Sequence, residues 1–176
     1  AGLVSVSAIA LLYALLSLRL LWPRIALPVI AYAPLMALAS LDVAVTLARP
    51  LEHGGWWAWP IALAVHALVL WRLAPSWPAA ARNAVHAIGV LVIALLGALQ
   101  GRALTIDWGD AMSAWGWLGW LVVPALLLML LPRHGLSRRW PVSAAPVAYR
   151  WIAAALLAAG LLLWTLLANI ASNGAA

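Results

Sequence analysis

Six long apolar runs constrain the fold of this chain more than any other feature of its sequence. Each run is close to the length of about 20 residues that an α-helix needs to cross the roughly 30 Å hydrocarbon layer of a membrane. The runs are rich in Leu and Ala and do not alternate between apolar and polar residues, which favours helices over strands. We therefore predict an all-α, polytopic transmembrane helix bundle of about six spans, over residues 2–18, 25–48, 56–73, 84–101, 114–131 and 151–170.

The composition indicates that lipid is the main solvent of the chain. Hydrophobic residues make up 68% of the sequence and charged residues only 8%, whereas a soluble domain has about 25% charged residues. So few polar side chains cannot cover a water-facing surface, and membrane lipid is therefore an expected partner. The net charge of +6 comes from arginines between the apolar runs and predicts no nucleic-acid partner. Cysteine is absent, which excludes disulfides and thiolate metal sites.

The two ends of the chain lie close to apolar runs. Residue 1 is Ala and leads directly into the first run, and the chain ends soon after the sixth. We expect residues 1–176 to form a single transmembrane bundle that is part of a longer chain. The remainder of that membrane protein would then be a partner of the bundle.

The arginines predict the orientation of the spans. The second and fourth connections between the runs carry Arg49 and Arg102 together with the acids Glu52, Asp107 and Asp110. Short cytoplasmic loops retain Lys and Arg, so we predict that the other three connections are cytoplasmic and that both ends of the chain lie on the outer side. Those three connections carry no acid and eight arginines, namely Arg19, Arg24, Arg72, Arg82, Arg133, Arg138, Arg139 and Arg150.

Four polar residues in or at the ends of the runs are candidates for an intramembrane site. Asp42 lies about six residues before the outer end of the second run, roughly 9 Å deep at 1.5 Å per residue. An intramembrane carboxylate is costly without a partner, and Arg102 and Arg49 are the candidate partners. His66 lies near the middle of the third run, and Gln100 lies at the end of the fourth. Asp42, His66, Gln100 and Arg102 could line a polar path; alternatively, Asp42 lies near the headgroups and His66 is satisfied by a neighbouring helix.

A second group of candidates lies on the predicted outer side. The sequence has 13 tryptophans, and many of them fall near the outer ends of the runs, beside three acids. Tryptophan stacks on sugar rings through its large apolar face and offers one hydrogen-bond donor. The alternative is an aromatic belt at the level of the headgroups. The candidates for an outer ligand surface are Glu52, His53, Trp56, Trp57, Asp107, Trp108 and Asp110.

No motif in the sequence specifies a reaction. The chain has no P-loop, no dinucleotide-binding glycine pattern and no nucleophile elbow. Its histidines fall at different predicted depths without the spacing of metal ligands. We therefore predict no metal site and no cofactor, and no catalytic residue is identified.

Three segments resemble a known family. Residues 52–60 read Glu-His-Gly-Gly-Trp-Trp-Ala-Trp-Pro and are followed by His66, while His86 and Gly89 stand at the start of the fourth run. Residues 164–174 read Trp-Thr-Leu-Leu-Ala-Asn-Ile-Ala-Ser-Asn-Gly. In these features, from about residue 20 to the end, the chain resembles the DUF2339 family of bacterial multi-pass membrane proteins. The resemblance implies a place in the bacterial inner (cytoplasmic) membrane and inside a longer chain, and it supplies no reaction.

Three classes of function are left open by the sequence. The first is transport or substrate handling through a polar path that includes Asp42, His66 and Arg102. The second is an outer-face enzyme or accessory protein that acts on lipid-linked sugars through the outer acids and tryptophans. The third is a structural scaffold for a larger membrane protein. A shared polar cavity of Asp42 and His66 would favour the first class, and convergence of the outer acids in a tryptophan-lined cleft would favour the second.

Overall fold

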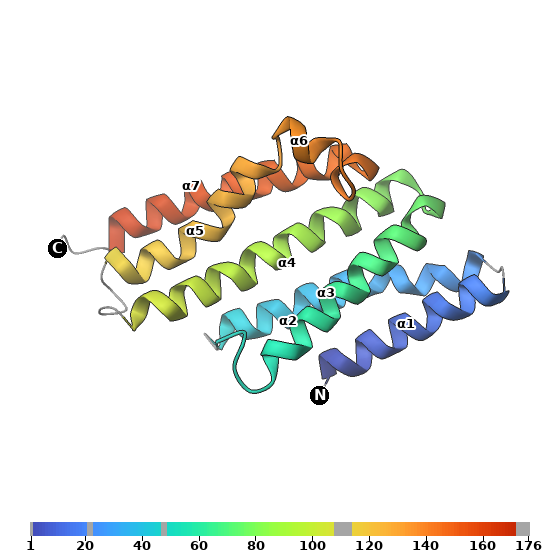
Figure 1. The fold of residues 1–176 in the computed structure, drawn as a ribbon. Helices are drawn as coiled ribbons and strands as arrows, with labels where there is room; N and C mark the ends of the chain where they lie inside the picture. Colours follow the sequence, from blue (N-terminus) through green and yellow to red (C-terminus); the bar gives the residue numbers. More distant parts are fainter. Residues whose placement is uncertain (1, 21–22, 47–48, 108–113, 172–176) are drawn as a thin grey trace.

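The computed structural model of the protein is a bundle of antiparallel helices (Figure 1). It describes residues 2–20, 23–46, 49–107 and 114–171, and in these ranges it contains helices and no strands. The helical elements are α1 (Gly2–Leu20), η1 (Pro23–Ala31), α2 (Tyr32–Val45), α3 (Gly55–Arg72), η2 (Ala74–Ser76), α4 (Ala79–Ile106), α5 (Ala114–Leu130), α6 (His134–Ser137), η3 (Val142–Ala144), η4 (Ala148–Ala153) and α7 (Ala154–Ala171).

The all-α prediction is confirmed, and each predicted run corresponds to one long helical segment. η1 continues directly into α2, and η4 continues into α7. Three segments are long and apolar enough to cross a membrane, namely Leu27–Val45, Ala79–Ile106 and Ala148–Ile170. The apolar stretches Gly2–Ser17 and Trp117–Leu130 are shorter. By length and composition, the structure thus contains three candidate spans among its described residues.

The boundaries of α4 differ most from those predicted. α4 begins at Ala79 rather than Ala84 and ends at Ile106 rather than Gly101. The helix starts directly after Pro78, and the first residues that follow include three alanines, which are the strongest helix formers. At the other end, Gly101 does not stop the helix because its backbone packs against a neighbouring helix.

α4 lies at the centre of the bundle (Figure 1) and separates two apolar cores. Its candidate span is 56% buried, compared with 28% and 17% for the spans of α2 and α7. Residues 85, 92 and 96 of α4 belong to the core with α1, α2 and α3. Residues 87, 90 and 94 lie on the opposite helical face and belong to the core with η3, η4 and α7. The helix is therefore apolar on both sides, as a central helix must be.

Glycines allow α4 and α5 to approach each other at the level of the backbone. A Cβ atom on Gly101 would overlap the carbonyl group of Gly119 in α5. A Cβ atom on Gly119 would in turn overlap the backbone of Arg102 and the hydroxyl of Thr105. Small residues at such contacts are typical of helix pairs in membranes, where close van der Waals packing supplies much of the association energy.

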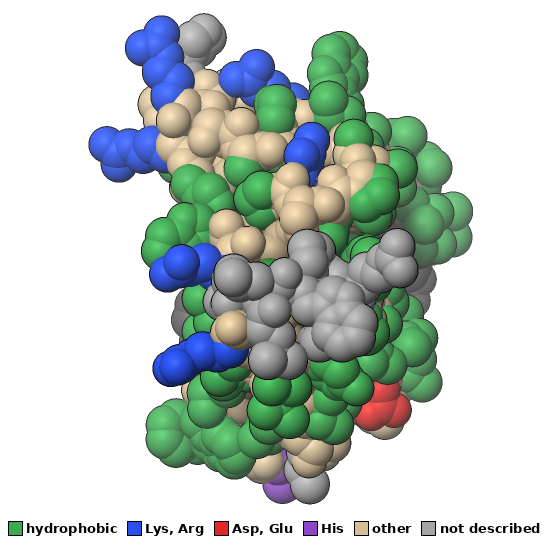
Figure 2. Space-filling model, turned by 90° about the vertical axis from the view of Figure 1, so that its right-hand side faces the viewer, with side chains coloured by type: hydrophobic (Ala, Val, Ile, Leu, Met, Phe, Trp, Pro, Cys, Tyr) green, Lys and Arg blue, Asp and Glu red, His purple; other side chains and the backbone are tan. Residues whose placement is uncertain are grey.

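The antiparallel arrangement separates the charges between the two ends of the bundle. The connections α1–η1, α3–α4 and α5–η4 meet at one end, which we call the arginine-rich end (Figure 1). Figure 2 looks onto this end and shows arginine side chains standing out between apolar ones. The opposite end holds Arg49, Arg102, Glu52 and Asp107. The connections that carry arginines without acids thus lie at one end of the folded molecule, and the connections that carry acids lie at the other.

Candidate functional site

The loop between α2 and α3 makes a tight turn that the sequence encodes locally. His53 and Gly54 both adopt the left-handed conformation, with φ of 50° and 88°. The Gly55 N–H donates to the Glu52 carbonyl at 2.8 Å, and the Glu52 N–H donates to the Arg49 carbonyl at 3.1 Å. Glycine adopts positive φ without steric cost, whereas other residues pay about 1–2 kcal/mol.

The two consecutive glycines also make room for their neighbours. A Cβ atom on Gly54 would come 3.0 Å from Nε1 of Trp57, because the indole lies over the turn. A Cβ atom on Gly55 would overlap the carbonyl of Pro50. The two glycines and Trp57 at the start of α3 are therefore explained by a close turn that carries an indole on its surface.

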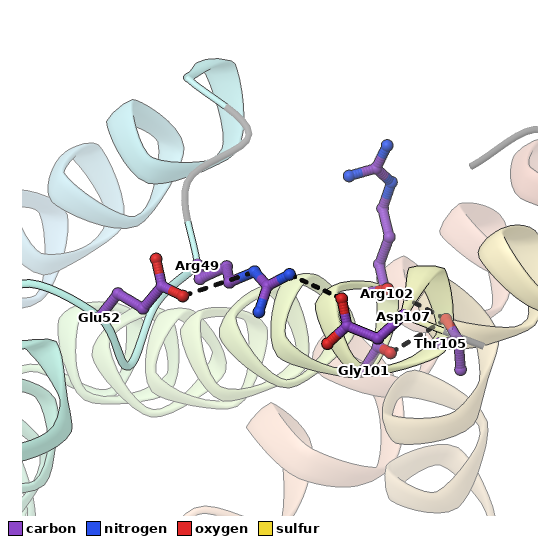
Figure 3. Close-up of polar contacts among 6 residues, drawn as sticks. All are labelled: Arg49, Glu52, Gly101, Arg102, Thr105 and Asp107. Carbon is purple, nitrogen blue, oxygen red and sulfur yellow. Dashed lines mark hydrogen bonds and ion pairs between the residues drawn. The ribbon is translucent and has the colours of Figure 1, made fainter. Parts of the chain in front are cut away.

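Two contacts attach this loop to the end of α4, and Figure 3 shows the one between Arg49 and Asp107. The Arg49 guanidinium donates to Asp107 at 2.8 Å and lies 3.5 Å from the Glu52 carboxylate. The Leu51 N–H donates to the side-chain oxygen of Gln100 at 3.4 Å. The ion pairs are exposed, and each is therefore worth about 0–1 kcal/mol. Their effect is to set the position of the loop rather than to stabilise the fold.

A cleft of about 580 Å³ opens between this loop, the first residues of α1, the end of α2 and the start of α3. We call it the α2–α3 cleft. Its polar lining is Asp42, Arg49, Glu52 and His53, and its apolar lining includes Leu3, Val6, Leu35, Ala39, Val43, Trp57 and Trp59. The cleft thus combines charged groups and tryptophans at one end of the bundle with apolar side chains toward its interior.

Asp42 is the unpaired acid of this cleft. Among the residues that the structure describes, its carboxylate has no hydrogen bond or ion pair. Neither of its two candidate partners binds it: Arg49 pairs with Glu52 and Asp107, and the Arg102 guanidinium lies 5.9 Å from the ring centroid of Trp120. The Arg102 side chain points away from the Arg49 ion pairs (Figure 3). Asp42 is also exposed, so its carboxylate can accept hydrogen bonds from a ligand.

The structure brings together only part of the predicted outer surface. Glu52, His53 and Trp57 line the cleft with Asp42. Trp56 is 68% exposed and does not line it, and Asp107 contributes indirectly by holding Arg49. Trp108 and Asp110 lie outside the described residues.

His66 lies apart from Asp42, deep in the bundle. It is 5% exposed, and it does not line the α2–α3 cleft. It belongs instead to a group of buried polar residues that includes Ser7, Tyr32, His86 and Tyr149. The sequence reasoning missed the roles of Ser7, Tyr32 and Tyr149. The available signal was a lone polar side chain in or beside an apolar run, which by itself predicts no partner.

A comparison with protein families agrees with this architecture. A family model described as "Predicted membrane protein (DUF2339)" matches residues 1–176, the whole chain. No curated protein and no solved structure matches the chain. The match extends the resemblance seen in the sequence to the first residues of the chain. The chain therefore belongs to the DUF2339 family of predicted membrane proteins.

Proposed function

We propose that this protein crosses the bacterial inner membrane six times and binds the neutral sugar headgroup of a lipid in the α2–α3 cleft. The proposal rests on the composition of this cleft. The carboxylate of Asp42, which has no partner among the described residues, and the indole of Trp57 line one largely apolar space. The role is that of an accessory protein that holds or presents a lipid-linked sugar on the outer side of the membrane.

Six spans are supported by the arrangement of the helices and charges. α1, α3 and α5 run alongside the three candidate spans, between the same two ends of the bundle (Figure 1). The arginine-rich end matches the positive charge that cytoplasmic loops retain. The α2–α3 cleft then lies on the outer side, and so do both ends of the chain.

The lining of the cleft suits an amphipathic ligand. Leu35, Val43 and Leu3 offer an apolar surface for the start of an acyl or isoprenoid chain. Asp42 and Glu52 offer oxygen atoms that accept hydrogen bonds from hydroxyl groups. An indole beside these acceptors provides a flat apolar face for a sugar ring.

The charges favour a neutral headgroup over a phosphate. Arg49 is the cation of the cleft, and Glu52 and Asp107 already compensate its charge. A phosphate entering the cleft would meet the unpaired Asp42 without a free guanidinium to bind it. Anionic lipids are therefore expected to bind more weakly than lipids with an uncharged sugar.

The site favours binding over glycoside cleavage. Cleavage needs a carboxylic acid that an apolar pocket keeps protonated, beside a second ionised carboxylate. Glu52 is exposed and ion-paired with Arg49, so it lies in no apolar pocket of that kind. Asp42 is exposed as well.

Binding can be tested with the purified full chain in lipid nanodiscs. Native mass spectrometry would measure retention of a monohexosyl diacylglycerol in competition with phosphatidylglycerol. We expect preferential retention of the sugar lipid, and a loss of about tenfold or more in Asp42→Asn, because one charge-assisted hydrogen bond is worth about 1.5–3 kcal/mol.

Neighbouring tryptophans provide the matched control. Trp57→Ala should weaken retention of the sugar lipid, whereas Trp56→Ala should leave it unchanged because Trp56 lies outside the cleft. Equal retention of both lipids by the unmodified protein would overturn the proposal. Equal effects of the two tryptophan variants would do the same.

A further inference from the structure

A line of buried polar residues crosses the bundle, with one residue from each of five helical segments. Ser7 belongs to α1, Tyr32 to α2, His66 to α3, His86 to α4 and Tyr149 to η4. All five are buried, and His86 is only 1% exposed. Buried polar groups in an apolar bundle are costly unless they bind one another.

The first part of the line joins α1, α2 and α3 through hydroxyl groups. The Ser7 oxygen lies 2.8 Å from the Leu3 carbonyl and 2.8 Å from the Tyr32 oxygen. The Tyr32 oxygen lies 2.9 Å from the Ala62 carbonyl. Two hydroxyl groups have only two protons for these three contacts. One of the three contacts must therefore lack a proton at any moment, so the two hydroxyls can adopt more than one proton arrangement.

The last part of the line joins α4 to η4. Nδ1 of His86 and the Tyr149 hydroxyl are 2.9 Å apart and form a hydrogen bond. The two rings meet edge to face, with centroids 5.4 Å apart. Tyr149 lies at the start of η4, beside the exposed Arg150, so this part of the line reaches toward the arginine-rich end.

His66 stands between the two parts. Its ring centroid is 6.3 Å from that of Tyr32, and its Nε2 lies against Gly89 of α4, about one helical turn from His86. Both ring nitrogens of His66, and Nε2 of His86, lack a hydrogen-bond partner among the described residues. Gly89 makes room for the His66 ring, since a Cβ atom there would overlap Nε2.

The titratable and charged groups that face the two histidines are few. Tyr32 from α2 and His86 from α4 face His66. Tyr149 from η4 faces His86, and Arg82, one helical turn away on α4, acts on it electrostatically. Among the described residues, no carboxylate interacts with either imidazole, so neither ring is fixed as a charged imidazolium by an ion pair.

We propose that this line is a proton relay through the bundle, with water molecules bridging the unpartnered nitrogens of His66 and His86. Neutral imidazole suits the task because one ring nitrogen accepts a proton while the other releases one. Histidine chains of this kind carry protons in membrane pumps and transporters. The relay is independent of sugar-lipid binding.

Each transfer conserves protons and charge. The Tyr149 hydroxyl gives its proton to Nδ1 of His86 and regains one from water at the arginine-rich end. His86 releases the proton on Nε2 through bridging water to His66, and His66 releases one toward the Tyr32 hydroxyl. Tyr32 passes a proton to Ser7, and Ser7 releases its own proton to water at the α2–α3 cleft, which begins one helical turn away at Leu3. An electrochemical proton gradient drives the net movement in either direction.

The test is proton flux into liposomes that contain the full chain and a pH-sensitive dye. A potassium gradient with valinomycin supplies the driving potential. We expect flux above that of protein-free liposomes, and a loss of about tenfold or more in His66→Asn and in His86→Asn. Tyr149→Phe keeps the ring and removes only the hydroxyl, so it tests the relay in a protein that retains its packing.

Ser40→Ala is the matched control. Ser40 is also buried, in α2, but its hydroxyl donates to the Ala37 carbonyl and lies outside the line. This variant should conduct like the unmodified protein. Flux equal to that of protein-free liposomes would overturn the proposal, and so would full flux in Tyr149→Phe.

Discussion

Replacing Gly101 by alanine tests the close approach of α4 and α5. The new Cβ atom would overlap the Gly119 carbonyl, which belongs to a helix backbone and cannot rotate away. Overpacking of this kind costs about 1–3 kcal/mol. Alanine regains up to about 1 kcal/mol through its higher helix propensity. A clash with backbone belongs in the upper part of the overpacking range, about 2–3 kcal/mol, so after the gain of about 1 kcal/mol the expected net loss is about 1–2 kcal/mol.

Gly160→Ala provides the matched control. Gly160 also lies inside a helix, but a Cβ atom there would meet nothing within 4 Å. The substitution then changes only the helix propensity of the residue. This variant should therefore be as stable as the unmodified protein, or more stable by up to about 1 kcal/mol.

Both variants can be compared by thermal unfolding in detergent, followed by size-exclusion chromatography of the protein that stays folded. A loss of 1 kcal/mol corresponds to roughly 2–4 °C for a chain of this size. Gly101→Ala should therefore unfold about 2–8 °C below the unmodified protein. A Gly101→Ala protein that unfolds at the same temperature as Gly160→Ala would refute the backbone contact between the two helices.

Three further predictions follow from the structure. The chain lacks cysteine, so single cysteines can report the orientation. A membrane-impermeant maleimide should label Glu52→Cys from the outer side of intact cells and Ser143→Cys only after lysis. The reverse pattern would refute the proposed orientation. Gly54→Val should lower retention of the sugar lipid more than Gly54→Asn, since Asn tolerates positive φ, and equal loss would show that the turn conformation is unimportant. Tyr32→Phe removes the contacts with Ser7 and the Ala62 carbonyl; it should lower stability by about 1 kcal/mol, with an unchanged unfolding temperature as the contrary result.

The helices could be predicted because their signal is local. The length and apolarity of a run such as residues 84–101 can be seen in that segment alone, without any other part of the chain. Its true boundaries, Ala79 and Ile106, could not be predicted as well, because Gly101 ends a helix in some surroundings and packs inside one in others.

The partners of the polar residues could not be predicted from the same pattern. Arg49 and Arg102 were equally reasonable partners for Asp42, yet one binds Glu52 and Asp107 and the other lies over Trp120. Ser7 and Tyr149 lie far from His66 in sequence. Their connection depends on the rotation of each helix about its own axis, which no single run specifies.

The sequence by itself thus determined the helical class and the alternating placement of charge along the chain. These properties follow from the free energy of placing each residue in lipid or water, which depends on that residue and its near neighbours. The tertiary structure alone decided that Asp42 joins a cleft with Trp57 and that five buried polar residues form a line. Those outcomes depend on the close packing of helices through residues such as Gly89, where the absence of one Cβ atom determines which side chains meet.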